Sequence, residues 1–281
     1  MQTYHDQLQT ILDTGVTRED RTGVGTISCF GMHARYNMAD GFPAVTTKKL
    51  AWKVMLSELL WFISGSGNLN DLKQIYKHNR IWDANYEDYL ARIGGNEDEN
   101  AGDMGRVYGV QWRRWQAPDG REVDQLQEAI DLIRNNPDSR RIIVNAWNPG
   151  EAGPDQVALP PCHTFFQFYV ADGRLSLQMY QRSADMFLGV PFNIASYSLL
   201  LHIVAKVTGL EAGDFVHAIG DAHIYLDSVD QVREQLSREP LPLPTLNITD
   251  RGQASVDDFV MADFELENYQ HHEPIYAKMA V

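Results

Sequence analysis

Cysteine is nearly absent from this chain of 281 residues, which contains only Cys29 and Cys162. Two cysteines allow one disulfide, but they exclude a disulfide scaffold and a cysteine-rich zinc site. No apolar run reaches the roughly 18 residues of a membrane span, so we predict no membrane partner. The first residues, MQTYHDQ, lack the basic and apolar blocks of a signal peptide, so we expect a cytoplasmic protein.

Positive charge is also scarce, because 24 Lys and Arg face 38 Asp and Glu and the formal net charge is −14. A general nucleic-acid binder needs clustered Lys and Arg for the phosphate backbone, so we expect no stable nucleic-acid partner. The arginines that are present lie in apolar or glycine-rich motifs. Locally positive pockets in an acidic protein suit a small anionic substrate.

Long linkers, internal repeats and low-complexity tracts are missing as well, and we predict one domain over residues 1–281. A chain of this length, 44% hydrophobic, can bury a sizeable core. Only residues 87–102 differ in composition, being rich in Gly, Asn, Asp and Glu. We interpret them as an exposed acidic insertion that forms a solvated loop.

Two extended runs, 159–170 and 173–185, flank the turn signal Ala171-Asp172-Gly173 and predict a β-hairpin. In the second run, one face is apolar and carries Leu175, Leu177 and Met179. The other face is polar and reaches Arg182, as expected for the floor of a polar site.

Cys162 lies at the outer end of the first run, so it approaches Arg182 if the hairpin closes in register. A thiol near a fixed positive charge is a candidate for a lowered pKa and for nucleophilic catalysis. The alternative is a structural cysteine, which is the role that we expect for Cys29.

Helical spacing predicts a helix over residues 50–64, with Glu58 among its apolar positions. Glu58 either faces solvent or is a buried carboxyl with a raised pKa. Further helices are predicted at residues 4–14, 123–136 and 194–208, the last preceded by a turn at 189–193.

Two adjacent arginines, Arg140 and Arg141, begin a strand-like run. Neighbours on a strand point to opposite faces, so one of them is expected to be buried or at an interface. This favours an anionic ligand or a second chain, and a salt-bridged pair is the alternative. Arg21, in the glycine-rich segment 20–26, either holds an anion or is a surface charge. His223 and Tyr225 alternate on a predicted strand, so both can face one site.

Long motifs of this chain closely resemble the thymidylate synthase family. The two longest are residues 158–170 (ALPPCHTFFQFYV) and 180–197 (YQRSADMFLGVPFNIASY). Shorter matching segments follow the family's order along nearly the whole chain: 20–26 (DRTGVGT), 42–49 (FPAVTTKK), 58–62 (ELLWF), 138–144 (DSRRIIV), 220–225 (GDAHIY) and 236–240 (LSREP).

The resemblance implies an α+β fold, a single domain with a large mixed β-sheet covered by helices. It implies that this sheet forms the interface of a homodimer, with Arg140 and Arg141 donated across the interface to the other subunit's substrate. It also implies reductive methylation of dUMP to dTMP, with 5,10-methylenetetrahydrofolate supplying the carbon and the hydride and leaving as dihydrofolate. No metal is implied.

The catalytic residues implied by the resemblance are Cys162, which adds to C6 of uracil, together with Glu58, Tyr108, Arg182, Asp185 and Asn193. The implied dUMP-binding residues are Arg21, Arg140, Arg141, Arg182, Ser183, Ala184, Asp185, Asn193, His223 and Tyr225. The implied folate-binding residues are Lys48, Ile81, Trp82, Asp185, Leu188, Gly189, Phe192 and Ala280.

An asparagine offers a donor and an acceptor, so Asn193 suits the N3–H and O4 edge of uracil, although by itself such an asparagine is more often a helix N-cap. The chain departs from the family pattern at Arg106, where proline is usual, and at Asn85, where many relatives carry tryptophan. These positions leave open a deoxyuridylate hydroxymethylase, in which water replaces hydride. A non-catalytic RNA-binding regulator is the remaining alternative.

Overall fold

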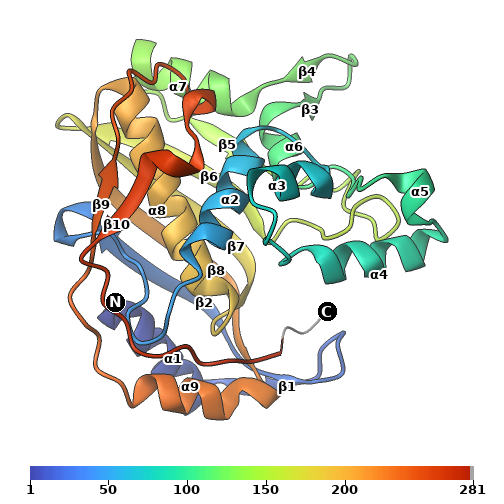
Figure 1. Ribbon diagram of the computed structural model, residues 1–281, viewed down its shortest axis with the longest axis vertical. Helices are drawn as coiled ribbons and strands as arrows, with labels where there is room; N and C mark the ends of the chain where they lie inside the picture. Colours follow the sequence, from blue (N-terminus) through green and yellow to red (C-terminus); the bar gives the residue numbers. More distant parts are fainter. Residues whose placement is uncertain (279–281) are drawn as a thin grey trace.

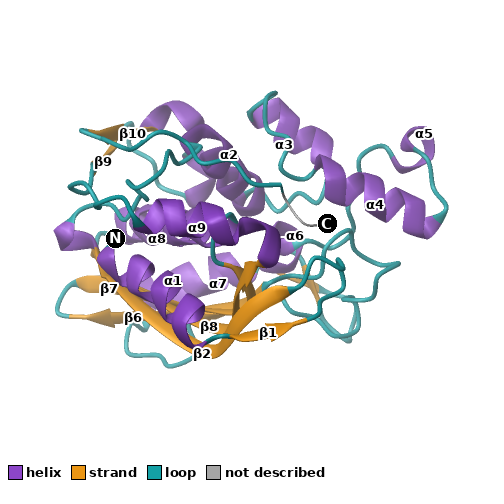
Figure 2. Ribbon diagram, turned by 90° about the horizontal axis from the view of Figure 1, so that it is seen from below, coloured by secondary structure: helices purple, strands orange, loops and turns teal. Residues whose placement is uncertain are grey.

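A mixed six-stranded β-sheet lies along one side of the molecule, and most of the helices gather on one of its faces (Figure 2). The computed structural model describes residues 1–278. The strands run in the order β1 (Val16–Arg18), β2 (Thr26–Asn37), β8 (Glu211–Tyr225), β7 (Arg174–Asp185), β6 (His163–Ala171) and β5 (Ile143–Asn145). Among the strands of residues 1–278, only β7 and β8 pair in parallel. The predicted α+β fold with a large mixed sheet is confirmed.

The predicted hairpin is formed by β6 and β7, with Ala171 paired to Arg174. Its two turn residues, Asp172 and Gly173, have φ of 51° and 75°. Positive φ at both central residues is the type I′ pattern, whose twist matches that of paired strands. The apolar face predicted for β7 is buried, since Leu175, Leu177 and Met179 are all 0% exposed.

Helix α8 (Gly189–Thr208) joins the parallel strands β7 and β8 and crosses the middle of the molecule (Figure 1). It is long and apolar enough to span a membrane, but 78% of its most apolar stretch is buried inside the fold. It therefore serves as a core helix. The predicted turn at 189–193 is wrong, because the helix begins at Gly189. Pro191 fits in the first turn, where no backbone N–H is required.

The remaining elements surround this sheet and α8 in the described residues (Figure 1). The helices are α1 (Gln2–Thr14), α2 (Trp52–Ile63), α3 (Leu69–Ile75), α4 (Asp83–Ile93), α5 (Glu97–Asn100), α6 (Tyr108–Arg113), α7 (Gln125–Asn135) and α9 (Val229–Leu236). Two small hairpins pair β3 (Trp115–Gln116) with β4 (Glu122–Val123) and β9 (Thr245–Ile248) with β10 (Phe264–Glu267).

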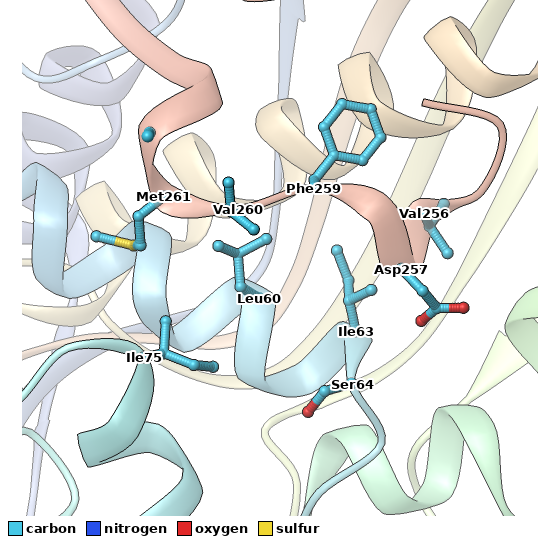
Figure 3. Close-up of a pocket in the computed structure, with 10 residues that line it drawn as sticks. Leu60, Ile63, Ser64, Ile75, Val256, Asp257, Phe259, Val260 and Met261 are labelled. Atoms are coloured by element: carbon cyan, nitrogen blue, oxygen red, sulfur yellow. The ribbon is translucent and has the colours of Figure 1, made fainter. Parts of the chain in front are cut away.

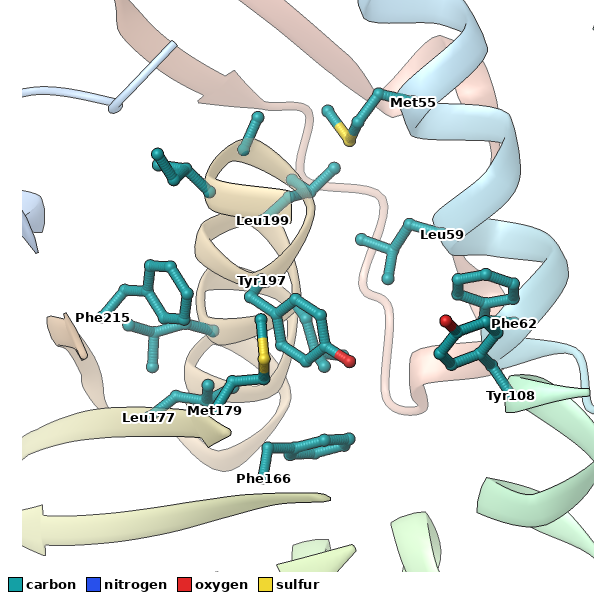
Figure 4. Close-up of a cluster of buried hydrophobic side chains, with 14 of the residues drawn as sticks. Met55, Leu59, Phe62, Tyr108, Phe166, Leu177, Met179, Tyr197, Leu199 and Phe215 are labelled. Atoms are coloured by element: carbon teal, nitrogen blue, oxygen red, sulfur yellow. The ribbon is translucent and has the colours of Figure 1, made fainter. Parts of the chain in front are cut away.

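The core joins three elements that carry candidate site residues. Figure 4 shows Leu177 and Met179 of β7 beneath Tyr197 of α8, with Leu59 and Phe62 of α2 beyond them. Full burial of such a side chain contributes about 1.5–3 kcal/mol, so several of them hold α2 firmly against the sheet. This packing places α2, and with it Glu58, at a fixed position relative to the β6–β7 hairpin.

Residues 87–102 differ from the predicted solvated loop, because α4 and α5 occupy most of this segment. The phenol of Tyr86 donates to Asn100 at 2.9 Å and accepts from the backbone N–H of Gly102 at 2.8 Å. This buried tyrosine anchors the segment. The acidic side chains Glu97, Asp98 and Glu99 remain exposed, so composition identified their exposure but not the helices.

Large apolar side chains are exposed on the sheet strands. Phe30 on β2 is 87% exposed and Tyr169 on β6 is 67% exposed. Burying aromatic groups of this size contributes substantially to binding interfaces. The exposed side chains are consistent with the expected homodimer, which stays a prediction.

Candidate active site

The β6–β7 hairpin brings Cys162 and Arg182 together, as the in-register pairing predicts. Arg182 donates its backbone N–H to the carbonyl of Cys162 at 2.9 Å. Its guanidinium Nη2 lies 3.9 Å from the sulfur of Cys162. The backbone N–H of Cys162 donates to the phenol oxygen of Tyr108 at 2.7 Å. The thiol therefore has one charged neighbour and a fixed backbone.

The expectation of a lowered thiol pKa is wrong for this structure. Burial raises the pKa of the Cys162 thiol, because a thiolate loses hydration there. The charge of Arg182 and the hydrogen bond with Tyr108 act in the opposite direction without cancelling the burial. The sequence pattern revealed the positive neighbour but could not reveal how deeply the sulfur lies.

The guanidinium of Arg182 is held in place by three groups. It donates from Nε to the carbonyl of Pro161 and from Nη2 to the carbonyl of Pro160, both at 2.9 Å. The indole of Trp147 covers it, with 5.0 Å between the guanidinium carbon and the ring centroid. Two prolines in succession leave their carbonyls directed at the arginine, so the segment before Cys162 also orients Arg182.

Tyr108 reaches Cys162 because α6 packs closely on α2. A Cβ atom built on Gly109 would lie 2.5 Å from the carbonyl oxygen of Phe62, so only glycine permits this approach. The rings of Tyr108 and Phe62 lie 4.8 Å apart. The phenol pKa of Tyr108 is raised well above its usual range by burial, so the hydroxyl stays protonated.

Glu58 lies on α2 and accepts a hydrogen bond from the indole nitrogen of Trp82 at 2.7 Å. Burial raises the pKa of Glu58 to about 7, while the hydrogen bond from Trp82 lowers it. Glu58 is half-buried, so of the two possibilities left open by the sequence the structure favours the carboxyl with a raised pKa. A carboxyl that titrates near neutral pH can both accept and return a proton.

The side-chain amide of Asn193 belongs to a buried network that the sequence did not reveal. Gln181 donates from Nε2 to Asn193 Oδ1 at 3.0 Å, and its Oε1 lies 2.9 Å from His217 Nε2. Burial lowers the pKa of His217 to about 3, so the ring is neutral and donates to Gln181. The network fixes which end of the Asn193 amide is the acceptor. The N-cap alternative for Asn193 is wrong, since α8 is capped by Leu188.

One signal could have found Gln181 and His217. Gln181 alternates with Arg182 on β7, so it points to the opposite, buried face. His217 occupies the buried face of β8 and is 0% exposed. Two polar residues on buried faces of neighbouring strands predict a hydrogen-bonded pair, because unsatisfied polar groups are costly there.

Asp185 ends β7 beneath the start of α8. One of its carboxylate oxygens accepts from the backbone N–H groups of Phe187 and Leu188, at 2.9 and 3.0 Å. Burial raises the pKa of Asp185 although these hydrogen bonds lower it. A Cβ atom built on Gly189 would lie 3.8 Å from Asp185 Cβ and 3.7 Å from Asn193 Oδ1. The absent side chain of Gly189 therefore leaves space between two candidate catalytic residues.

His223 and Tyr225 lie near the end of β8, beside the end of β7. The strand register pairs His223 with Asp185, and Ala184 and Ser183 pair with the residues just before it. The rings of His223 and Tyr225 lie 5.2 Å apart, and His223 Nδ1 lies 3.1 Å from Asp221 Oδ1. Ala184 is 0% exposed, so it can offer a ligand only its backbone.

Arg21 lies near these strand ends on an exposed turn. Asp20 shapes that turn by accepting from the backbone N–H groups of Thr22 at 3.0 Å and of Gly25 at 2.8 Å. The pKa of Tyr225 is raised to about 12, first by burial, and Asp185 raises it further while Arg21 lowers it. Arg21 is thus close enough to Tyr225 for its positive charge to oppose the rise in the phenol pKa.

Arg140 and Arg141 lie apart from this cluster, in the turn between α7 and β5. The predicted strand at these positions is wrong, because β5 begins only at Ile143. Both arginines are exposed in the single chain. Neither is buried within its own subunit, so the expected role at an interface stays a prediction.

Several of the predicted folate residues are apolar and partly buried. Ile81, Leu188 and Phe192 are half-buried, and Trp82 is 5% exposed. Apolar side chains together with the half-buried carboxyl of Asp185 are groups that suit an aromatic heterocycle with a polar edge. Lys48 fits less well, because its Nζ donates inward to the Phe187 carbonyl at 2.5 Å and burial lowers its pKa to about 7. Ala280 lies outside the described residues.

The two departures from the family pattern lie close to the candidate site. Asn85 is half-buried in the first turns of α4, three residues after Trp82. Arg106 precedes α6 and forms an ion pair with Glu151 at 2.9 Å. Residues 1–278 contain no group of three His, Cys, Asp or Glu side chains arranged to hold a metal ion.

A separate hollow of about 470 Å³ lies on the other side of α2, lined by Leu60, Ile63 and the segment 256–262 (Figure 3). None of the predicted site residues lines it. The chemistry that Cys162 and its neighbours can support therefore lies elsewhere, at the edge formed by the ends of β7 and β8.

A thiol beside a guanidinium, a carboxyl that titrates near neutral pH and an oriented amide together suit nucleophilic catalysis on a polar ring. The family model described as thymidylate synthase matches residues 2–281, essentially the whole chain. The chain belongs to the thymidylate synthase family.

Proposed function

We propose that this protein is a methyltransferase that converts dUMP to dTMP, with 5,10-methylenetetrahydrofolate as the donor of carbon and hydride and dihydrofolate as the second product. The observation that carries the proposal is the position of the Cys162 thiol, 3.9 Å from the guanidinium of Arg182, in a chain of this family. The proposal is for a cytoplasmic enzyme of one catalytic domain that functions as a homodimer.

Cys162 is the proposed nucleophile. Its sulfur adds to C6 of uracil, which gives C5 the character of an enolate and makes that carbon reactive. Arg182 favours the thiolate by its charge and opposes the effect of burial. Tyr108 holds the backbone of Cys162, so the sulfur keeps one position relative to the ring.

Asn193 reads the base in this proposal. Uracil presents a donor at N3 and an acceptor at O4, and one amide can pair with both. Gln181 holds the amide orientation, which favours uracil over cytosine because cytosine presents a donor at C4. Glu58, with a pKa of about 7, exchanges protons near O4 through water during the reaction.

The phosphate and sugar of dUMP bind among Arg21, Arg182, Ser183, His223 and Tyr225. Guanidinium groups suit phosphate because their planar forks donate two parallel hydrogen bonds. Arg140 and Arg141 bind the phosphate in the other subunit, which explains why both are exposed in a single chain.

The folate supplies the one-carbon unit and the hydride when it is bound. Asp185 accepts a hydrogen bond from its heterocycle, while Ile81, Leu188 and Phe192 provide apolar contacts and Gly189 leaves space for the ring. Trp82 helps to exclude water. Lys48 instead has a supporting role beneath the site, because its ammonium contacts the carbonyl and the ring of Phe187.

A deoxyuridylate hydroxymethylase is the second candidate, since Asn85 and Arg106 depart from the family pattern close to the site. The two reactions give products of different mass. The purified protein is incubated with dUMP and 5,10-methylenetetrahydrofolate, and product mass and dihydrofolate absorbance are followed. Formation of dTMP with dihydrofolate supports the proposal. Hydroxymethyl-dUMP without dihydrofolate favours the second candidate, and no product from fully reduced protein contradicts both.

A further inference from the structure

The carboxylate of Glu151 collects three side-chain donors at a single oxygen. Its Oε2 accepts from Arg106 Nε at 2.9 Å, from Gln111 Nε2 at 2.8 Å and from Asn148 Nδ2 at 3.0 Å. Arg106 also donates to the carbonyl of Arg114 at the end of α6. The side chains of Arg106 and Glu151 are only 25% and 26% exposed, so solvent screens this pair incompletely.

Glu151 ends a short turn, residues 148–151, that is held by hydrogen bonds. Its backbone N–H donates to the Asn148 carbonyl at 3.0 Å, and the N–H of Gly150 donates to Asn148 Oδ1 at 3.1 Å. At the other end of this segment, Trp147 donates its backbone N–H to the carbonyl of Thr164 on β6 at 3.1 Å. Trp147 is therefore held between β6 and a turn whose position depends on Glu151.

The same carboxylate supports Tyr108, which contacts Cys162, and Trp147, which covers the Arg182 guanidinium beside it. Through Arg106 and Gln111 it holds α6, and α6 carries the Tyr108 phenol that binds the N–H of Cys162. Through the turn it holds Trp147, whose indole covers the Arg182 guanidinium next to the thiol. Glu151 is thus the point at which the two supports of the nucleophile are joined.

We propose that Arg106 and Glu151 are positioning residues, an ion pair that keeps Tyr108 and Arg182 in their places around Cys162. The inference rests on the proposed function only in naming Cys162 as the nucleophile. Charge-assisted hydrogen bonds to one carboxylate have strict geometry, which suits a positioning role. Arg106 thereby provides a contact that proline, the usual residue of the family at this position, cannot make, because proline has no donor group.

Loss of the Arg106–Glu151 ion pair is expected to destabilise the thiolate of Cys162. If Trp147 moves off the guanidinium, water reaches Arg182 and screens its charge, so the thiolate loses stabilisation. The other titratable groups near the sulfur are Tyr108, His163 and Tyr225, and Tyr225 stays protonated because burial raises its pKa to about 12. Tyr108 remains protonated because its pKa is raised, and burial lowers the pKa of His163 to about 3, so that ring stays neutral. Arg182 is therefore the charge whose position matters.

The test measures alkylation of Cys162 by iodoacetamide as a function of pH, in a Cys29→Ser background without nucleotide. Arg106→Ala and Glu151→Gln remove the charge pair, Arg106→Lys retains it, and Arg233→Ala removes an exposed arginine as the matched control. At pH 8 we expect alkylation about three- to tenfold slower in the first two variants, the effect of losing about one ordinary hydrogen bond. In Arg106→Ala and Glu151→Gln, the midpoint of the curve of alkylation rate against pH moves to higher pH. Arg106→Lys recovers most of the alkylation rate, and Arg233→Ala leaves the rate unchanged.

Steady-state kinetics with dUMP and the thermal midpoint complete the test. The inference predicts that the KM for dUMP rises in Arg106→Ala, because Arg182 also binds substrate. A lower thermal midpoint with an unchanged alkylation profile in both charge-removing variants would show a merely structural ion pair and overturn the inference. If either Arg106→Ala or Glu151→Gln fails to fold, the alkylation profiles of the remaining one and of Arg106→Lys still test the inference. Alkylation does not require catalysis, so an inactive wild-type enzyme would contradict the proposed function alone.

Discussion

Replacing Glu58 by glutamine should stabilise the protein at alkaline pH while it impairs catalysis. Burial raises the pKa of Glu58 from 4.5 to about 7, so the ionised carboxylate is unfavourable in the native state. That difference in pKa corresponds to about 3 kcal/mol of native-state destabilisation once the group is fully ionised. Glutamine stays neutral at every pH and retains an oxygen that accepts the hydrogen bond from Trp82.

The pH dependence follows from proton binding in the two states. Below pH 4.5 the carboxyl is protonated in both the native and the unfolded chain, so the wild type bears no penalty. Between pH 4.5 and about 7 the native state holds the proton more tightly, so the unfolding free energy of the wild type falls as pH rises. Above about pH 7 the penalty is complete. The advantage of Glu58→Gln should therefore grow across this range and then level off.

Urea unfolding of both proteins at pH 4, 6 and 8, at one protein concentration, measures this difference. Glu87→Gln, on the exposed side of α4, is the matched control, with an expected change below about 0.5 kcal/mol. The kcat of Glu58→Gln should fall at least about 100-fold if the carboxyl transfers protons. If the gain in unfolding free energy of Glu58→Gln over the wild type is constant with pH, or greatest at pH 4, the raised pKa of Glu58 is refuted.

Three further predictions concern specificity, assembly and stability. Asn193→Asp should lower kcat/KM for dUMP at least about tenfold and raise that for dCMP, measured by product mass, because a carboxylate cannot donate to O4. If the protein forms the expected homodimer through this sheet, Phe30→Asp should give a monomer in sedimentation experiments at neutral pH, and a dimer that persists would place the interface elsewhere. Arg251→Ala should lower the unfolding free energy, measured by urea unfolding, strongly at pH 7 and progressively less as the pH falls towards 2, because Arg251 holds the pKa of Asp263 at about 2 and the stabilisation is lost as the carboxyl is protonated.

The hairpin and its thiol–guanidinium pair were predictable because both depend on local rules. The turn Asp172-Gly173 determines the register, and alternation along β7 assigns its faces, so the position of Arg182 beside Cys162 follows. The direction of the thiol pKa shift was not predictable. It depends on how much protein surrounds the sulfur, which is set by α6, Trp147 and other segments distant in the sequence.

Some helices could not be predicted from the sequence either. The start of α8 was missed because Gly189 and Pro191 are typical of turns, yet the first helical turn tolerates both. The helices within residues 87–102 were missed because their acidic composition indicates exposure and carries little information about backbone conformation. The Gln181–His217 contact joins neighbouring strands whose pairing could not be read from either strand alone.

The central claim is that the sulfur of Cys162 initiates the conversion of dUMP. The most direct test compares the wild type, Cys162→Ser and Cys29→Ser in one reaction with dUMP and 5,10-methylenetetrahydrofolate, with dTMP quantified by mass. We expect full product from the wild type and Cys29→Ser, and a loss of several orders of magnitude in Cys162→Ser, as for other covalent nucleophiles. Comparable dTMP formation by a correctly folded Cys162→Ser protein would contradict the account.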